Sequence, residues 1–320
     1  MKAIQHALDP AGPQAAHIAG LWWITIAVSA IVFLAILAAL AIALWRRPRA
    51  TEATAGDPRP LHEHEPRSRR AVVIATAASA VGLFGLLVAS VRTDHALANL
   101  PLRDALAIEV VAHQWWWDVH YSDQDPSKSF STANEIHIPV GRPVLLTLKS
   151  ADVIHSFWVP NLHGKRDLIP GRTATFPIQA DKPGTYRGQC AEYCGAQHAY
   201  MGLFVVAEAP DAFERWRTAQ AASAPEPTGA AAQGRDLFVS GSCMLCHAVR
   251  GTTADGRTAP DLTHVASRQT LAAGRLPNDA QHLTQWIADP QQFKPGVNMP
   301  AHALPQEQMQ ALVAYVESLK

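Results

Sequence analysis

Two long apolar runs dominate the first third of the chain. Residues 21–45 and 71–91 contain no charged residue and no histidine. A helix needs about 20 apolar residues to cross the hydrocarbon core of a bilayer, and both runs reach that length. A buried helix of a soluble protein is the alternative, but two uncharged runs of this length in one chain disfavour it. The pattern predicts two transmembrane helices, preceded by a segment over 1–20 and joined by a loop over 46–70.

Basic residues are concentrated in that loop, whereas only Lys2 precedes the first run. The positive-inside rule therefore places the loop in the cytoplasm and puts both termini on the opposite side of the membrane. The first run is not typical of a simple cleavable signal peptide, because it starts too far along the chain and no basic flank precedes it. The loop arginines are Arg46, Arg47, Arg49, Arg59, Arg67, Arg69 and Arg70.

After residue 92 the pattern changes to short apolar and β-branched runs separated by Pro- and Gly-containing breaks. Regularly spaced strands of this kind indicate a sandwich or barrel, here over residues 104–208. Three consecutive tryptophans follow Gln114, and strand alternation would send Trp115 and Trp117 to one face and Trp116 to the other. The predicted strands are Ala107 to Val111, Val144 to Leu148, Thr173 to Ile178 and Leu203 to Val206.

An Ala- and Pro-rich stretch over 209–232 is typical of a flexible, partly extended linker. The remaining residues, 233–320, predict a small helical domain. Its closing helix follows Pro305 and carries apolar residues at core spacing, namely Leu312, Val313, Val316 and Leu319.

Composition narrows the function classes. The chain has 320 residues, a net charge of zero and only 17% charged residues. Nucleic-acid binding is disfavoured, because phosphates demand a basic face. All four cysteines fall in two short motifs. If both motifs bind cofactors, no thiol is left for a structural disulfide.

The first motif contains Cys190, Cys194, His198 and Met201, and His155 lies upstream. Thiolate, imidazole and thioether are ligands that favour copper over hard cations. A disulfide or a zinc site is the alternative for the cysteine pair alone, but neither explains the accompanying His and Met. Two thiolates can bridge two copper ions, with one histidine capping each ion and Met201 as a weak axial ligand.

The second motif is Cys243-Met244-Leu245-Cys246-His247, the signature of covalent haem attachment. His247 would bind the iron. A thioredoxin-like site is the alternative, but no βαβ pattern surrounds the motif. For the sixth iron ligand Met299 is preferred over Met309, which falls among core-spaced helix residues; His264 and His302 also remain open. A His/Met pair raises the haem potential.

With these motifs the chain, from about residue 14 to 320, resembles cytochrome c oxidase subunit II with a fused class I cytochrome c domain. The resemblance implies a cupredoxin-like Greek-key barrel that holds dinuclear copper A on His155, Cys190, Glu192, Cys194, His198 and Met201. Glu192 would bind copper through its carbonyl, and its side chain would reach a magnesium ion shared with subunit I; a solvated loop charge is the alternative. Trp115 would pass electrons to the copper, and Lys165 to Arg172 would face the catalytic subunit.

The same resemblance implies that the Pro260 carbonyl orients His247. It further implies electron flow from soluble cytochrome c, or a similar donor, through haem c and copper A to subunit I. That subunit would reduce oxygen to water and pump protons, whereas this chain is a non-catalytic electron-transfer subunit. We expect a bacterial inner membrane, contact with lipid and other oxidase subunits, and both cofactor domains in the periplasm. The alternatives are a copper A subunit of a nitric oxide reductase and a membrane-tethered carrier without a catalytic partner. Quinol oxidase subunits of this fold lack the copper ligands, so the sequence argues against that class of protein.

Overall fold

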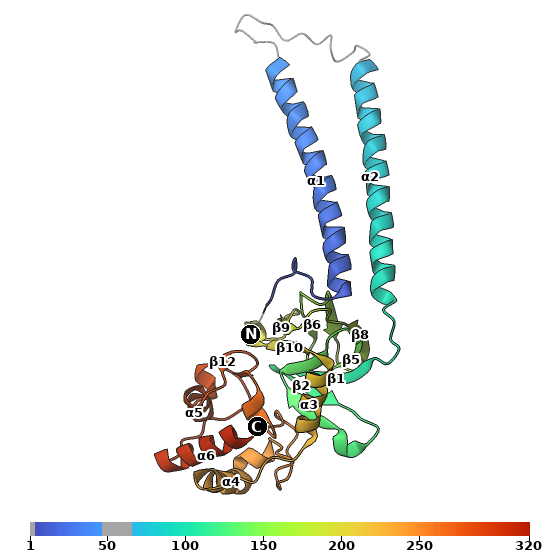
Figure 1. Ribbon diagram of the computed structural model, residues 1–320. Coiled ribbons are helices and arrows are strands. Elements are labelled where there is room, and N and C mark those ends of the chain that lie inside the picture. Colours follow the sequence, from blue (N-terminus) through green and yellow to red (C-terminus); the bar gives the residue numbers. More distant parts are fainter. Residues whose placement is uncertain (1–3, 47–65) are drawn as a thin grey trace, which may run out of the picture. The chain divides into compact units, whose positions relative to one another are not determined.

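The computed structural model describes residues 4–46 and 66–320 (Figure 1). It divides into two compact units, which are described separately. His17–Asn99 form one unit, and Met1–Ala16 with Leu100–Lys320 form the other.

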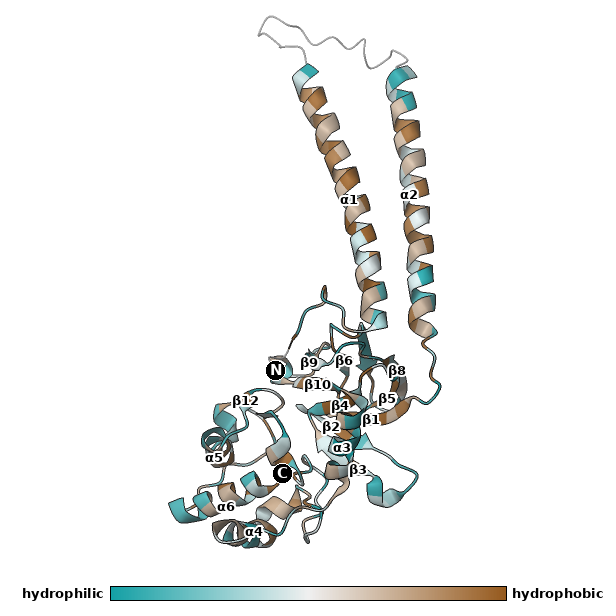
Figure 2. Cartoon of the chain, in the orientation of Figure 1, coloured by the Kyte–Doolittle hydropathy of each residue, from teal (hydrophilic) through white to brown (hydrophobic). Residues whose placement is uncertain are grey.

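Two long helices make up the hairpin unit. Helix α1 spans Pro13–Arg46 and α2 spans Pro66–Ala98, so both extend beyond the predicted apolar runs into polar flanks. Each is long and apolar enough to cross a membrane, and Figure 2 shows hydrophobic residues along most of α1. Many of their large apolar side chains, such as Phe33 in α1 and Phe84 in α2, are exposed. This exposure suits surfaces that face lipid or a partner. Lys2, Arg47, Arg49 and Arg59 lie outside the described residues.

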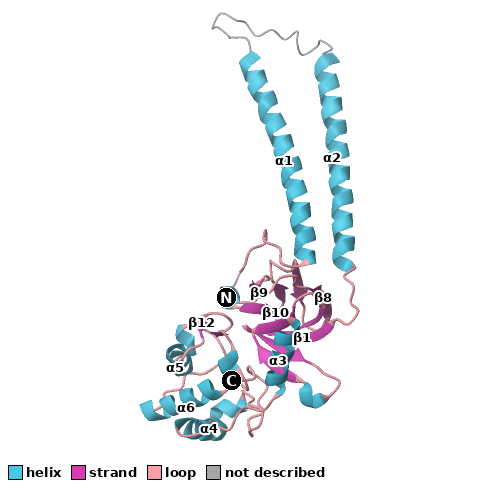
Figure 3. Ribbon diagram, in the orientation of Figure 1, coloured by secondary structure: helices cyan, strands magenta, loops and turns pink. Residues whose placement is uncertain are grey.

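The middle of the chain is all β, as the sequence predicts (Figure 3). Two five-stranded sheets have the orders β3-β2-β1-β5-β8 and β4-β10-β9-β6-β7. The pairs β1–β5 and β4–β10 are parallel, so the chain crosses between sheets as in a cupredoxin-like fold. The strands are β1 Leu106–His113, β2 Trp116–Tyr121, β3 Phe130–Ala133, β4 Glu135–Pro139, β5 Val144–Ser150, β6 His155–Trp158, β7 Lys165–Leu168, β8 Ala174–Ile178, β9 Gly184–Cys190 and β10 Gly202–Glu208.

Alternation along the strands builds the core of this domain. In β1, Ile108, Val110 and Ala112 point inward and are fully buried, as expected for a sheet with one covered face. The tryptophan run keeps the predicted alternation in burial, since Trp115 and Trp117 are buried and Trp116 is half-buried. Trp115 lies in the turn between β1 and β2, not in a strand. Both Trp115 and Trp117 nevertheless belong to the buried core of this domain.

The predicted linker is helical in its first half. Helix α3 spans Pro210–Ala221. Phe213 is fully buried in the core of the β domain, and Trp216 stacks on His137 with ring centroids 4.0 Å apart. Phe213, Trp216 and Gln220 follow a helical spacing, a signal that the Ala- and Pro-rich composition obscured. The extended part of the linker is confined to residues 222–229.

Three helices form the C-terminal domain: α4 Ala230–Ser240, α5 Ala280–Ala288 and α6 Gln306–Ser318 (Figure 3). A short hairpin pairs β11 Thr270–Leu271 with β12 Leu276–Pro277. Helix α6 packs on α4, and a Cβ atom at Gly234 would lie 1.9 Å from the Ala311 carbonyl oxygen. Only glycine allows this close crossing. The core includes the predicted residues Leu312, Val313, Val316 and Leu319.

Candidate metal and haem sites

The proposed copper ligands come from one end of the β domain. Cys190 ends β9, and His155 begins the neighbouring strand β6. Cys194 and Met201 lie in the loop that follows β9. The side chains of these two residues and of Cys190 and His155 are each at most 2% exposed. His198 begins the 3₁₀ helix η3 (His198–Tyr200) and is half-buried. Neighbouring strands therefore bring residues 35 positions apart to one point.

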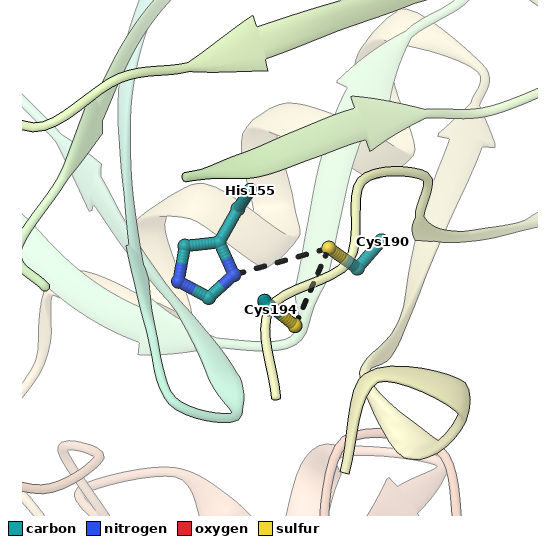
Figure 4. Close-up of side chains that lie close together, drawn as sticks. All are labelled: His155, Cys190 and Cys194. Carbon is teal, nitrogen blue, oxygen red and sulfur yellow. Dashed lines mark hydrogen bonds between the residues drawn. The ribbon is translucent and has the colours of Figure 1, made fainter. Parts of the chain in front are cut away.

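The donor atoms form a continuous chain of contacts, and Figure 4 shows its part from His155 through Cys190 to Cys194. Cys190 Sγ lies 3.8 Å from His155 Nδ1, 3.7 Å from Cys194 Sγ and 3.2 Å from the Glu192 carbonyl oxygen. Cys194 Sγ lies 3.6 Å from His198 Nδ1 and 3.9 Å from Met201 Sδ. A disulfide would need a sulfur separation of about 2.05 Å. Atoms bound to one metal at about 2.0–2.3 Å lie roughly 3–4 Å apart, so the spacing fits a metal centre.

A carboxylate fixes the orientation of His155. The ring nitrogen Nε2 lies 2.7 Å from Asp152 Oδ1, which leaves Nδ1 facing Cys190. Asp152 Oδ2 also accepts a hydrogen bond from the Gln114 amide at 2.6 Å. Burial alone would raise the pKa of Asp152, but these hydrogen bonds lower it overall. The arrangement matches the carboxylate–histidine pairs that orient metal ligands.

The two thiols cannot easily ionise together. Their mutual hydrogen bond lowers the pKa of Cys190, and contacts with His155 and the main chain act in the same direction. The pKa of Cys194 is raised, chiefly by the same contact and then by burial. A second thiolate beside the first is unfavourable in a buried site. Cations bound between the sulfurs would remove that penalty, so the donor set fits copper held by both thiolates.

Trp115 and Gln114 close one side of this site. The Trp115 indole N–H donates to the Cys194 carbonyl at 2.9 Å, and the Gln114 amide donates to the same oxygen at 2.8 Å. Gly195 has φ +108°, and a Cβ atom there would lie 3.0 Å from Gln114 Nε2 and 3.2 Å from the Trp115 ring. Glycine is therefore required both by its backbone conformation and by the tight contact.

The haem attachment motif lies in the C-terminal domain. Cys243 is in the 3₁₀ helix η4 (Ser242–Leu245), and Cys246 is exposed. His247 Nδ1 lies 2.7 Å from the Pro260 carbonyl oxygen, so Nε2 is the nitrogen left for iron. Burial lowers the pKa of His247, which keeps the ring neutral, as a metal ligand must be. Partly exposed thiols beside an anchored, neutral histidine fit covalent haem.

The candidates for the sixth iron ligand differ in their surroundings. Met299 is half-buried and packs against the same apolar cluster as Cys243. Met309 is 8% exposed, within the core face of α6. Both ring nitrogens of His264 lie within hydrogen-bonding distance of main-chain carbonyls. Gln291 Nε2 donates to the Met299 carbonyl at 3.2 Å and to a second carbonyl two residues earlier. Of these candidates, Met299 lies in a loop and, like Cys243, packs at the margin of the apolar cluster.

Glu192 extends away from the thiols toward β7. Its carboxylate lies 3.0 Å from Lys165 Nζ, and Lys165 also contacts Asp167 at 3.2 Å. A surface pocket of 430 Å³ is lined by most of the segment Lys165 to Arg172, namely Lys165, Arg166, Asp167, Ile169 and Arg172, together with Thr173 and Ala174. Within the described ranges, 4–46 and 66–320, the compact ligand group of His, Cys and carboxylate residues consists of His155, Cys190 and Cys194.

Sequence reasoning missed the residues that orient the ligands. Asp152 stands three residues before His155, and Gln114 immediately precedes Trp115. A carboxylate close before a metal-binding histidine is a usable signal. No pattern in the sequence indicates that Gln114 reaches the copper loop.

Comparisons with known proteins identify families for both cofactor domains. The family described as "Cytochrome C oxidase subunit II, periplasmic domain" matches residues 124–208, and the cytochrome c family matches residues 231–320. Cytochrome c oxidase subunit 2 of Alkalihalophilus pseudofirmus is 36% identical over 328 residues, covering 98% of this chain and 90% of that protein. This chain belongs to the cytochrome c oxidase subunit 2 family.

Other members of the cytochrome c oxidase subunit 2 family match shorter stretches. The protein of Bacillus sp. PS3 is 31% identical over 272 residues, covering 79% of this chain and 75% of that protein. The periplasmic domain of subunit II of cytochrome oxidase from Bradyrhizobium japonicum is 30% identical, covering 36% of this chain and 92% of that structure, with a TM-score of 0.34. Family membership implies copper A and haem c as cofactors, and the donor atoms described above fit both.

Proposed function

We propose that this chain is the subunit through which electrons enter a haem–copper terminal oxidase. Electrons would pass from a soluble donor such as cytochrome c, through covalent haem c, to dinuclear copper A and on to subunit I. Subunit I would reduce oxygen to water with proton pumping, and this chain would be a non-catalytic part of that enzyme. The observation that most directly supports this proposal is the set of donor atoms around Cys190 and Cys194, in which neighbouring atoms lie 3.2–3.9 Å apart.

Each donor has a defined task in this proposal. Cys190 and Cys194 would hold both copper ions through their thiolates, and His155, His198, Met201 and the Glu192 carbonyl would supply the remaining ligands. When bound, dinuclear copper A and haem c supply one-electron carriers. The surrounding strands hold the ligands rigidly, so little rearrangement is needed when the charge changes. The low exposure of the thiols and His155 also keeps water from the centre.

The haem would be held by four side chains of the C-terminal domain. Cys243 and Cys246 would attach the haem covalently, and His247 and Met299 would supply the iron ligands. The Pro260 carbonyl keeps the His247 ring in one tautomer, which increases its strength as a ligand.

Glu192 would have a second role at the subunit interface. Its carboxylate is a suitable hard ligand for magnesium shared with subunit I. The carboxylate now pairs with Lys165, so binding of magnesium requires the Lys165 side chain to move away. The segment Lys165 to Arg172, part of which lines the adjoining pocket, would then face the catalytic subunit.

The membrane arrangement follows from the charge pattern. We place α1 and α2 across a bacterial inner membrane, with the predicted loop over 46–70 on the cytoplasmic side and both cofactor domains in the periplasm. The two apolar helices and the basic loop support this orientation. Contacts of the helices with lipid and with other oxidase subunits would cover their exposed apolar side chains.

Gas consumption tests this function. The native complex is isolated from membranes through this chain and supplied with reduced cytochrome c. We expect oxygen uptake that cyanide inhibits. Consumption of nitric oxide without oxygen uptake would identify a nitric oxide reductase instead. Isolation of the chain alone, with neither gas consumed, would identify a tethered electron carrier.

A further inference from the structure

The C-terminal domain contacts the copper domain through the loop that leads to Met299. Lys294 Nζ donates to the Trp115 carbonyl at 2.8 Å and to the Ala272 carbonyl at 3.3 Å. Gln197, which lies between copper-loop residues Cys194 and His198, donates from Nε2 to the Pro295 carbonyl at 2.7 Å. Two hydrogen bonds thus join consecutive residues of the C-terminal domain to the wall of the copper site.

Apolar contacts continue this junction. A Cβ atom at Gly296 would lie 3.7 Å from Trp115 Cη2, so the Gly296 backbone lies against the indole ring. Val297 packs on the hydrophobic core of the copper domain. Trp115 is consequently 8% exposed, and its ring is separated from solvent by residues that precede Met299 by only a few positions.

Lys294 is unusual in this junction because its side-chain nitrogen is buried. It is 2% exposed, and among the described residues no ion pair involves it. Removal from water lowers its pKa to about 7. A buried ammonium or amine is unfavourable unless hydrogen bonds satisfy it, and here two carbonyls do so. The Trp115 carbonyl in turn receives a donor that no strand partner supplies, since Trp115 lies in a turn.

We propose that Lys294 is a positioning residue that holds the Met299 loop of the haem domain on Trp115. This inference rests on the proposed function. The transfer that it serves moves one electron, oxidising ferrous haem and reducing the copper pair, and needs no further reactant. The connection runs from the Met299 loop through Gly296 and the Trp115 ring to the Cys194 carbonyl.

A second set of contacts keeps the haem domain in the same place. The Gly202 amide donates to the Ala273 carbonyl at 3.0 Å, and the Gln269 amide donates to buried Glu135 Oε1 at 2.6 Å. Arg275 lies 4.1 Å above the Tyr200 ring. One consequence is that a soluble donor cannot reach Trp115 directly. The donor must therefore dock on the haem domain.

The distance between the two centres provides the first measurement. Pulsed EPR on the oxidised, full-length complex reports the separation of the ferric haem and the copper pair, and it does not depend on turnover. We expect one narrow distance in the unmodified protein. A broad distribution would mean that the haem domain swings freely and would overturn the proposal, even if oxygen uptake is normal.

Substitution of Lys294 provides the second measurement. Lys294→Met removes the donor and keeps the side-chain length, and exposed Lys128→Met is the matched control. After flash reduction of the haem, we expect copper reduction to be slower by about tenfold or more in Lys294→Met, given the steep cost of misplacing reacting groups. The distance distribution should broaden while both optical spectra stay unchanged. Unchanged rate and distance in Lys294→Met would overturn the positioning role, and oxygen uptake would still test the oxidase function separately.

Discussion

The Trp115 indole N–H and the Cys194 carbonyl are 2.9 Å apart, so the aromatic side chain is bonded to the residue that carries a copper-binding thiol. The main-chain carbonyl of the same tryptophan accepts a hydrogen bond from Lys294 Nζ. Trp115 therefore contacts both the copper loop, through its indole N–H, and the Met299 loop, through its carbonyl and its ring. A tryptophan in a turn can do this, because its ring and its carbonyl point in different directions.

Replacing Trp115 by phenylalanine removes the hydrogen bond but keeps an aromatic ring. We expect copper reduction by the haem to slow several-fold, because the Cys194 carbonyl loses one of its two side-chain donors. Flash reduction of the haem followed by the copper absorption measures this rate. Trp116→Phe is the matched control, since Trp116 stacks on His113 away from the copper loop. An equal effect of the two substitutions would contradict the role of Trp115.

Asp152 fixes the ring of His155, so Asp152→Asn should weaken copper binding. Loss of such an outer partner typically lowers metal affinity roughly 10- to 100-fold. Competition with a copper chelator measures the change. Asp181→Asn is the control, since Asp181 is exposed and contacts Gln179 instead of a ligand. Equal copper retention in both variants would show that the Asp152 contact is dispensable.

Cys190→Ser removes one of the two bridging sulfurs. At most a mononuclear copper should remain on Cys194, His198 and Met201, and the mixed-valence signal of a dinuclear centre should disappear. EPR and metal analysis of the purified complex test this outcome. A two-copper delocalised spectrum in the variant would refute the bridging assignment.

Met299→Ala should free the sixth coordination position of the haem iron. We expect the low-spin His/Met spectrum to be lost, while the haem remains covalently attached through Cys243 and Cys246. Met309→Leu is the control, because Met309 belongs to the helical core and this volume-conserving change costs little stability. If Met299→Ala kept the spectrum and Met309→Leu lost it, the iron ligand would be Met309.

His163 predicts a pH dependence for the copper domain. Burial, assisted by nearby Arg166, lowers the pKa of His163 from 6.5 to about 4, and its Nδ1 accepts the Gly164 amide at 2.7 Å. The unfolded chain therefore binds the proton first, so stability is full above pH 6.5 and falls as the pH drops toward about 4. We expect a loss of about 2 kcal/mol after allowing for partial solvent screening. Thermal unfolding across this range, with His163→Asn as the comparison, should show a flatter profile in the variant.

The sequence predicts most of the fold because each element has its own local pattern. The uncharged runs predict α1 and α2, alternation predicts strands such as β1, and core spacing predicts α6. Helix α3 was obscured because its pattern rests on Phe213 and Trp216 within an Ala-rich stretch. The turn at Trp115 breaks a run of strand-forming tryptophans, and no local signal marks the break.

The ligands are predictable because soft donors at fixed spacing are rare. The residues that orient these ligands are harder to predict from the sequence. Asp152, Gln114 and Lys294 act through contacts between segments that are distant in the sequence or through a turn. A lysine between Phe293 and Pro295 has no sequence feature that predicts burial, since lysine is almost always exposed. The burial of Lys294 results from contact between the haem domain and the copper domain, which local sequence does not predict.

The most direct test of electron entry through the haem uses a complex that cannot attach it. In a Cys243→Ser, Cys246→Ser double variant the copper ligands are untouched. Oxygen uptake with reduced soluble cytochrome c should then be almost lost, while the copper EPR signal remains as in the unmodified complex. Undiminished oxygen uptake by the variant would show that the donor reduces the copper directly, and would contradict the proposed route from haem c to copper A.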